Sequence, residues 1–187
     1  MKVALFASGR GSNVENIIQF FNGNKRINIS LICSNNKSSG AVLHAKNHKI
    51  PYFFLTKHDL LDSKTLIKEL HDAKIDLLVL AGFLLKIPAF FIKNFKGKII
   101  NIHPSLLPKY GGKGMYGDNI HNLVLKNKEK ETGITFHYVN ENYDEGEIIA
   151  QFKIKIDKFE TLNSLKKKIS QEELLNYPII ISSFLDE

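Results

Sequence analysis

An amide and an imidazole stand two residues apart in the run Asn101-Ile102-His103-Pro104, at the end of an apolar stretch that begins at Lys98. Side chains alternate along a strand, so Asn101 and His103 are expected to project from the same face. Pro104 disfavours a helical backbone at His103 and ends the strand there. An amide donor beside a titratable imidazole can stabilise a developing oxyanion and move a proton. The pair predicts a catalytic site, and the alternative is a histidine with a structural role only.

A second candidate is the glycine-rich turn from Gly9 to Asn13, which follows the first apolar segment of the chain. Val14 stands where a dinucleotide-binding motif needs its third glycine, and no acidic residue ends the second strand, so an NAD site is disfavoured. The backbone N–H groups of Gly11, Ser12 and Asn13 at a helix N-terminus suit a phosphate monoester. The alternative is that the glycines only shape the turn, with Ser12 or Asn13 capping the helix.

Asp144, in the turn before Gly146, supplies a third chemical group. A carboxylate near His103 would favour the protonated imidazole, and the alternative is an ordinary turn residue. His44 and His48 have the i, i+4 spacing of a metal-binding pair on a helix. No further ligand stands at a matching spacing, so we expect a solvated face there and no metal.

The elements that must position these residues alternate over the first hundred residues. Apolar strands are expected at residues 3–7, 27–33, 52–55, 77–80 and 98–102, with helices through residue 21, over 39–47 and 63–73, and after Pro88. Such strands between helices form a parallel sheet covered on both faces. Ligands of these sheets bind beyond the carboxyl ends of the strands, where Asn101, His103 and the glycine-rich turn would meet. The predicted fold class is α/β, a Rossmann-like and mostly parallel sheet with helices on both faces.

The pattern changes after residue 101. A flexible loop is expected at 110–117, a helix to about residue 126, strands of a C-terminal antiparallel addition at 132–139 and 148–156, and a helix over 161–177. Pro178 is expected to kink or break that helix before a short apolar helix to Phe184. We expect one domain over residues 1–187, with a phosphate-binding half at 1–100 and a catalytic half at 101–187.

Composition narrows the class of protein. A chain of 187 residues, 43% hydrophobic, can bury a sizeable core in one domain. The single cysteine, Cys33, excludes a disulfide framework and fits a reducing compartment. No signal peptide or membrane span is visible, so we expect a cytoplasmic protein without a membrane partner. The net charge of +7 comes from scattered lysines, with arginine only at Arg10 and Arg26, which favours a solvated surface over a nucleic-acid site.

Taken together, these motifs resemble the phosphoribosylglycinamide formyltransferases, a family of folate-dependent enzymes of purine synthesis. The matching stretches, in the family's order, are Ser8-Gly-Arg-Gly-Ser-Asn13, Leu80-Ala-Gly-Phe83, Asn101-Ile-His-Pro-Ser-Leu-Leu-Pro-Lys-Tyr110, Thr132-Gly-Ile-Thr135 and Tyr143-Asp-Glu-Gly146. The resemblance implies transfer of the formyl group of 10-formyltetrahydrofolate to the amine of glycinamide ribotide, without a metal, by a monomer or homodimer. Asn101, His103 and Asp144 would be the catalytic set, with Asp144 keeping His103 charged beside the oxyanion of the tetrahedral intermediate.

The resemblance also assigns binding residues. Gly11, Ser12 and Asn13 would bind the ribotide phosphate, and Glu173 would contact the ribotide. The formyl folate would be held by two loops, by Asn101 and by Lys64, a basic residue near its acidic tail. The loop residues are Leu84, Leu85, Lys86, Ile87, Asn140, Glu141, Asn142, Tyr143 and Asp144. Two positions depart from the family's pattern, namely Lys86 in a usually apolar stretch and Leu174 where relatives often carry histidine.

Three other functions remain open from the sequence. Methionyl-tRNA formyltransferases share the catalytic motif and bind nucleic acid, but they need a further C-terminal domain, which we do not expect here. Formyltetrahydrofolate hydrolases share the site but carry an additional N-terminal domain, whereas the first strand here is expected to start near Lys2. The third is a non-catalytic sugar-phosphate-binding module, against which the complete set of Asn101, His103 and Asp144 argues.

Overall fold

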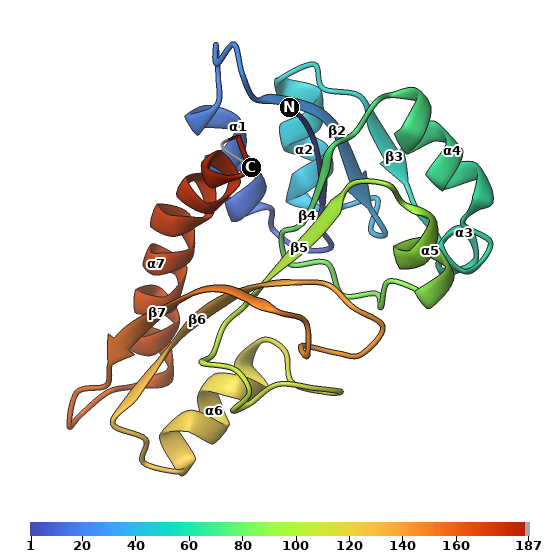
Figure 1. The fold of residues 1–187 in the computed structure, drawn as a ribbon. Coiled ribbons are helices and arrows are strands. Elements are labelled where there is room, and N and C mark those ends of the chain that lie inside the picture. Colours follow the sequence, from blue (N-terminus) through green and yellow to red (C-terminus); the bar gives the residue numbers. More distant parts are fainter. Residues whose placement is uncertain (186–187) are drawn as a thin grey trace.

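The computed structural model describes residues 1–185 and shows helices packed around one mixed sheet (Figure 1). The strands are β1 (Lys2–Phe6), β2 (Asn28–Ser34), β3 (Tyr52–Phe54), β4 (Leu77–Leu80), β5 (Lys98–His103), β6 (Glu131–Tyr138) and β7 (Ile148–Lys155). Within the described residues the sheet has seven strands in the order β3-β2-β1-β4-β5-β6-β7. Strands β1 to β5 are parallel, and β6 and β7 join them in antiparallel pairing. The predicted fold class, a mostly parallel sheet with an antiparallel C-terminal addition, is confirmed.

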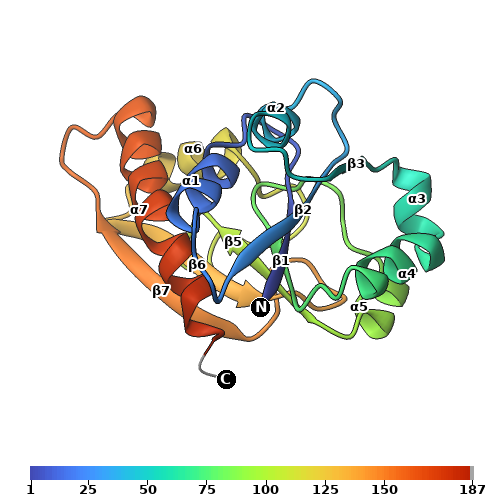
Figure 2. The same cartoon turned by 90° about the horizontal axis from the view of Figure 1, so that it is seen from above.

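Helices cover both faces of this sheet, as Figure 2 shows from above. They are α1 (Ser12–Phe20), α2 (Gly40–Asn47), α3 (Lys57–Leu61), α4 (Lys64–Asp72), α5 (Ala89–Asn94), α6 (Asp118–Lys126) and α7 (Leu162–Ser183). Helices α1, α2, α6 and α7 share one apolar core, and α3, α4 and α5 share the other. Strand β1 serves both cores because its side chains alternate: Val3 and Leu5 enter the first, and Ala4 and Phe6 enter the second.

Each predicted strand overlaps an observed one, but the short helix α3 is absent from the prediction. Thr56 and Asp59 start this helix with a capping box, in which Thr56 Oγ1 accepts from the Asp59 amide at 3.1 Å. The Asp59 carboxylate in turn accepts from the Thr56 amide at 2.7 Å. A helix of five residues is too short to show the apolar periodicity on which sequence prediction relies.

Helix α7 runs without interruption through Pro178, so the predicted break at that residue is wrong. Proline has no N–H and cannot donate to the carbonyl four residues earlier, which here belongs to Leu174. Asn16 of α1 supplies the missing donor, because its Nδ2 lies 2.6 Å from the Leu174 oxygen. The carbonyl that Pro178 leaves free is therefore satisfied by a neighbouring helix, and α7 continues.

The antiparallel addition carries side chains to the carboxyl end of β5. Strand β6 pairs with β5 so that His137 lies opposite Asn101 and Thr135 lies opposite His103. The chain then turns back through residues 139–147, where Gly146 packs against the carbonyl of Tyr138 with no room for a Cβ atom. Among residues 1–185, none of the helices has both the length and the hydropathy needed to cross a membrane.

Candidate active site

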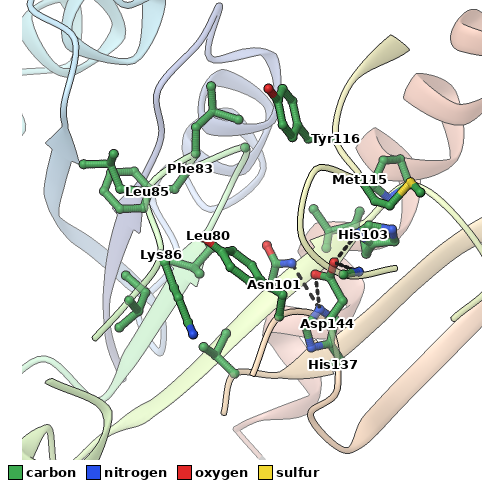
Figure 3. Close-up of a pocket in the computed structure, with 18 of the residues that line it drawn as sticks. Leu80, Phe83, Leu85, Lys86, Asn101, His103, Met115, Tyr116, His137 and Asp144 are labelled. Carbon is green, nitrogen blue, oxygen red and sulfur yellow. Dashed lines mark hydrogen bonds and ion pairs between the residues drawn. The ribbon is translucent and has the colours of Figure 1, made fainter. Parts of the chain in front are cut away.

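A cavity of about 620 Å³ lies beyond the carboxyl ends of β4 and β5. Its walls come from the loop 82–87, the glycine-rich loop 112–117 and the turn 139–147 (Figure 3). Asn101, His103 and Asp144 all line this cavity, although Asp144 is far from the other two in the sequence. The structure therefore brings the three residues of the predicted catalytic set to one place.

The buried ring of His103 faces an oxygen acceptor at each nitrogen. Its Nε2 lies 2.8 Å from the carbonyl oxygen of Tyr110, and its Nδ1 lies 3.4 Å from Asp144 Oδ2. A carbonyl only accepts, so Nε2 carries a hydrogen, and Nδ1 can donate to the carboxylate only if it carries one as well. Both contacts are satisfied at once by the imidazolium, so this environment suits a positively charged His103.

Asp144 is largely buried between two histidines and the glycine-rich loop. Its Oδ2 accepts from the Gly112 amide at 2.9 Å, and its Oδ1 lies 3.8 Å from His137 Nε2. Burial alone would raise the pKa of Asp144, but the hydrogen bond and charge of His103, with the Gly112 amide, outweigh burial and lower that pKa. Asp144 is therefore ionised at neutral pH. Its backbone has φ of 57°, a strained conformation that aspartate tolerates better than most residues.

His137 completes the arrangement and was not predicted from the sequence. Its Nδ1 lies 2.8 Å from the Tyr138 carbonyl and must donate there, which leaves Nε2 to accept from Asn101 Nδ2 at 3.1 Å. Burial lowers the pKa of His137, so the ring stays neutral and keeps this acceptor. The bond orients the Asn101 amide, whose second N–H hydrogen remains available. The alternation of Thr135 and His137 with apolar residues in the predicted strand was the available signal.

Two side chains, those of Tyr110 and Thr135, hold the segment after β5 through two hydrogen bonds each. Tyr110 has φ of 57°, and its hydroxyl donates to Glu129 Oε1 at 2.8 Å and accepts from Asn127 Nδ2 at 2.9 Å. Thr135 Oγ1 donates to the Ser105 carbonyl at 2.7 Å and accepts from the Leu107 amide at 3.0 Å. These bonds fix the Tyr110 carbonyl, which in turn fixes the His103 ring.

The glycine-rich turn leads directly into α1. Gly11 is the N-cap residue with φ of 77°, and no side chain caps the helix, so the alternative of a Ser12 or Asn13 cap is wrong. A Cβ atom at Gly11 would meet the backbone nitrogen of Ala41 at 2.6 Å. The first amides of a helix have no intrahelical partner, and together with the helix dipole they attract an anion.

Asn13 and Glu173 link this turn to the cavity, because both side chains line it. Asn13 Nδ2 donates to Glu173 Oε2 at 3.0 Å, which joins α1 to α7. Burial raises the pKa of Glu173, and the hydrogen bond from Asn13 only partly opposes that effect. A ligand with hydroxyl groups could use this carboxyl group as a hydrogen-bond partner.

Most residues assigned to the folate line the cavity, and some do not. Those on its wall are Leu84, Leu85, Lys86, Ile87, Asn101, Asn140, Asn142, Tyr143 and Asp144. Glu141 is exposed outside the wall, as is Lys64 at the start of α4. Gly11 and Ser12 also lie outside it, while Asn13 reaches it. The Lys86 ammonium lies 4.9 Å from the centre of the Tyr143 ring, a cation–π contact that fixes a positive charge on the wall.

Metal-ligand geometry is absent from the described part of the chain, since no three His, Cys, Asp or Glu residues gather closely enough to hold an ion. His44 Nε2 instead lies 3.8 Å from Glu15 Oε2. This contact joins α2 to α1 on the outside of the first core.

Comparison with known proteins gives a consistent picture. Residues 1–181 match the family model described as formyl transferase. The chloroplastic phosphoribosylglycinamide formyltransferase of Arabidopsis thaliana is 34% identical over 100% of this chain and 66% of its own length. The phosphoribosylglycinamide formyltransferase of Bacillus subtilis (strain 168) is 34% identical over 98% of this chain and 94% of its own length. The chain thus spans just under two thirds of the plant relative and nearly all of the bacterial one.

Solved structures give the same result. The phosphoribosylglycinamide formyltransferase of Anaplasma phagocytophilum superposes with a TM-score of 0.89 at 33% identity, covering 99% of this chain and 86% of that one. The enzyme of the same name from Bacillus halodurans has a TM-score of 0.88 at 32% identity, and the match covers 100% of this chain and 96% of that one. These matches confirm the resemblance that the sequence motifs carry.

Proposed function

The chain belongs to the formyl transferase family, and from this we propose that it transfers the formyl group of 10-formyltetrahydrofolate to the amine of phosphoribosylglycinamide, a step of purine biosynthesis. The observation that supports the proposal best is the convergence of Asn101, His103 and Asp144 on one cavity. The relatives that match at least 98% of the chain carry the name of this activity.

The ribotide is proposed to enter from the α1 side of the cavity. Its phosphate would accept hydrogen bonds from the amides of Gly11, Ser12 and Asn13 at the uncapped helix N-terminus. Glu173 lines the same side and would contact the sugar. These contacts place the glycinamide amine, at the other end of the ribotide, toward Asn101 and His103.

The folate is proposed to lie along the loop 82–87 and the turn 139–147. Leu85 and Ile87 supply apolar surface for its ring system, and the backbone of residues 140–144 supplies polar groups for its edge. Lys86 adds a positive charge on this wall. The formyl group would then face the catalytic set.

The catalytic residues act on the tetrahedral intermediate. When the ribotide amine attacks the formyl carbon, a C–N bond forms and the carbonyl oxygen becomes an oxyanion. Asn101 would donate the N–H hydrogen that His137 does not use, and charged His103 would donate from Nδ1. The 3.4 Å separation of Nδ1 and Asp144 is long for a charged hydrogen bond, so a substrate oxygen beside Asp144 could share this N–H without any turn of the ring. The intermediate then expels the folate nitrogen, which takes up the proton lost by the amine.

The same proposal includes the division of the chain into two halves, its location in the cell and its oligomeric state. Residues 1–100 would form the ribotide phosphate-binding half of a single domain, and residues 101–187 the catalytic and folate-binding half. Cytoplasmic location, a monomer or homodimer, and action without a metal or nucleic acid remain predictions, and the Arabidopsis relative is chloroplastic by name.

A competition between acceptors tests the proposed reaction. The purified full-length chain is given 10-formyltetrahydrofolate with a labelled formyl group and either phosphoribosylglycinamide, methionyl-tRNA or no acceptor, at physiological ionic strength. We expect label on the ribotide only, and His103→Ala serves as the control for host enzymes. Labelled tRNA would indicate a methionyl-tRNA formyltransferase, and labelled free formate would indicate a formyltetrahydrofolate hydrolase. Ribotide binding without turnover would indicate a non-catalytic binding module.

A further inference from the structure

Two amide side chains of α1 contact two successive residues of α7, where these helices lie side by side (Figures 1 and 2). Asn13 donates to the Glu173 carboxylate at 3.0 Å, and Asn16 donates to the Leu174 carbonyl at 2.6 Å. Asn13 and Asn16 are three residues apart, so they share one face of α1. The Leu174 carbonyl is the one to which Pro178, lacking an N–H, cannot donate from within its own helix.

Beside these two hydrogen bonds, apolar side chains pack between the helices. Val14 and Ile17 of α1 enter the same apolar core as Ile169 and Tyr177 of α7. Apolar contacts of this kind are not directional, so a hydrogen bond between the helices adds a constraint on distance and angle that they lack. A short, half-buried hydrogen bond to a backbone carbonyl constrains the relative position of the helices, because it requires one distance and one angle.

We propose that Asn16 is a positioning residue of the ribotide site. By occupying the carbonyl that Pro178 leaves free, it sets α7 in register with α1 and so places Glu173 against Asn13 and the helix N-terminus. Asn16 does not line the cavity and would not contact the ribotide itself. This inference rests on the proposed function, since it gives Glu173 a role in ribotide binding.

The first test removes the donor. Asn16→Ala is expected to raise the ribotide KM and calorimetric Kd about threefold to tenfold, the range of one lost hydrogen bond. The folate KM and the kcat at saturation should stay within about twofold, because no group near the formyl carbon moves. Asn16→Leu should give the same result, which separates the lost donor from a lost volume. Gln19→Ala is the matched control, because that exposed α1 amide donates to Glu15 of its own helix.

The second test restores a donor within α7. Pro178→Ala supplies an N–H that can also bond to the Leu174 carbonyl, so that carbonyl is satisfied within α7 even when Asn16 is removed. A bond within α7 does not fix α7 against α1, so it does not replace the contact that Asn16 makes between the helices. Asn16→Ala should therefore still raise the ribotide Kd about threefold to tenfold in the Pro178→Ala chain, whereas its cost in thermal stability should be smaller there than in the wild-type chain. A purely structural role would lower the thermal midpoint without moving the ribotide Kd.

The outcomes separate this inference from the proposed function. If the wild-type chain formylates the ribotide but Asn16→Ala and Asn16→Leu bind it with unchanged Kd, only the inference fails. The inference is also overturned if Asn16→Ala no longer changes the ribotide Kd in the Pro178→Ala chain, because the residue would then matter only for satisfying the Leu174 carbonyl. If the Pro178→Ala chain does not fold, the Asn16→Ala and Asn16→Leu affinities still decide the matter. If the wild-type chain neither binds nor formylates the ribotide, the proposed function itself fails.

Discussion

The proposed ligand groups lie at two ends of the cavity, a ribotide end at the N-terminus of α1 and Glu173, and a catalytic end at the carboxyl end of β5 and Asp144. Different kinds of contact hold these two ends. At the ribotide end the expected ligand-binding groups are backbone amides, and their position depends on the conformation of Gly11 and on the packing of α1 against α7. At the catalytic end the groups are the side chains of Asn101, His103 and Asp144, which contact His137, Tyr110 and one another. Changes at the first end should therefore alter affinity or folding, and changes at the second should alter the rate of formyl transfer.

The largest effect is expected at the catalytic end. His103→Ala should lower kcat roughly 100- to 10,000-fold, because it would remove the proposed donor to the oxyanion. Steady-state kinetics measures this loss. His121→Ala is a matched control, because His121 is also buried but lies outside the cavity wall. A His103→Ala chain with near-normal kcat would show that the histidine is structural.

Asp144→Asn should have the next largest effect, a loss of about tenfold or more in kcat at neutral pH. Asparagine keeps the size of the side chain and tolerates the positive φ, so the change removes the charge that faces His103. If turnover is unchanged, the charge of Asp144 plays no part in the reaction.

The pH dependence of stability provides a second measurement on the same variant. Because the pKa of Asp144 is lowered by folding, its ionised form stabilises the protein above the usual aspartate pKa of about 3.9. This contribution is lost as the pH falls through the lowered pKa. The difference in unfolding free energy between wild type and Asp144→Asn should therefore be present at pH 7 and vanish in strong acid. A constant difference would contradict the ion pair.

Gly11→Ala tests the ribotide end. The added Cβ meets the backbone of Ala41 and forces alanine into a positive φ, so we expect a loss of about 1–3 kcal/mol in stability as well as weaker ribotide binding. Gly23→Ala is the matched control, because Gly23 has φ of 74° but open space around it. It should lose less stability and keep its ribotide affinity. Equal losses in both variants would mean that the close packing of Gly11 is unimportant.

Glu173→Gln should stabilise the protein at neutral pH, by less than Gly11→Ala destabilises it. Burial raises the pKa of Glu173, so the folded state binds its proton more tightly and stability falls as the pH rises from the ordinary value of about 4.3 through the raised one. Glutamine does not ionise, so this variant should unfold at a higher temperature than wild type above that interval. It should also bind the ribotide more weakly, which thermal unfolding with and without ribotide would reveal.

The smallest effects are expected on the folate wall. Lys86→Ala should raise the folate KM about threefold, in keeping with the loss of one exposed cation–π contact and its charge. Lys64→Ala should change it less than about twofold, because Lys64 is exposed outside the cavity and surface charges contribute little. A larger effect of Lys64→Ala would support the assignment of Lys64 to the acidic tail of the folate, which was made from the sequence motifs.

The sequence was most informative where the structure depends on local features. Continuous apolar segments and turn residues predict the strands, their mostly parallel arrangement and a site at the carboxyl end of the strand that ends near residue 102. The continuity of α7 was not predictable, because the donor for the Leu174 carbonyl is Asn16, 158 residues away in the chain. Helix α3 was missed because five residues show no periodicity.

The site residues also fall into two groups, those that sequence motifs reveal and those whose place depends on the fold. Asn101, His103 and Asp144 stand in recognisable motifs, and the structure places them around one cavity. The alternation of polar and apolar residues marks the face of β6 on which His137 lies, but the pairing of β6 with β5 decides that His137 lies opposite Asn101. Glu141 and Lys64 were assigned by position within matching stretches, and local folding leaves both outside the cavity wall.

Ribotide binding to the His103→Ala chain, measured by calorimetry beside the wild-type chain, tests the division between the two ends most directly. Our account predicts a Kd within about threefold of wild type even though turnover is lost, because the phosphate and sugar contacts lie on α1 and α7. A loss of ribotide affinity as large as the loss of turnover would contradict it, since binding and formyl transfer would then depend on the same residues.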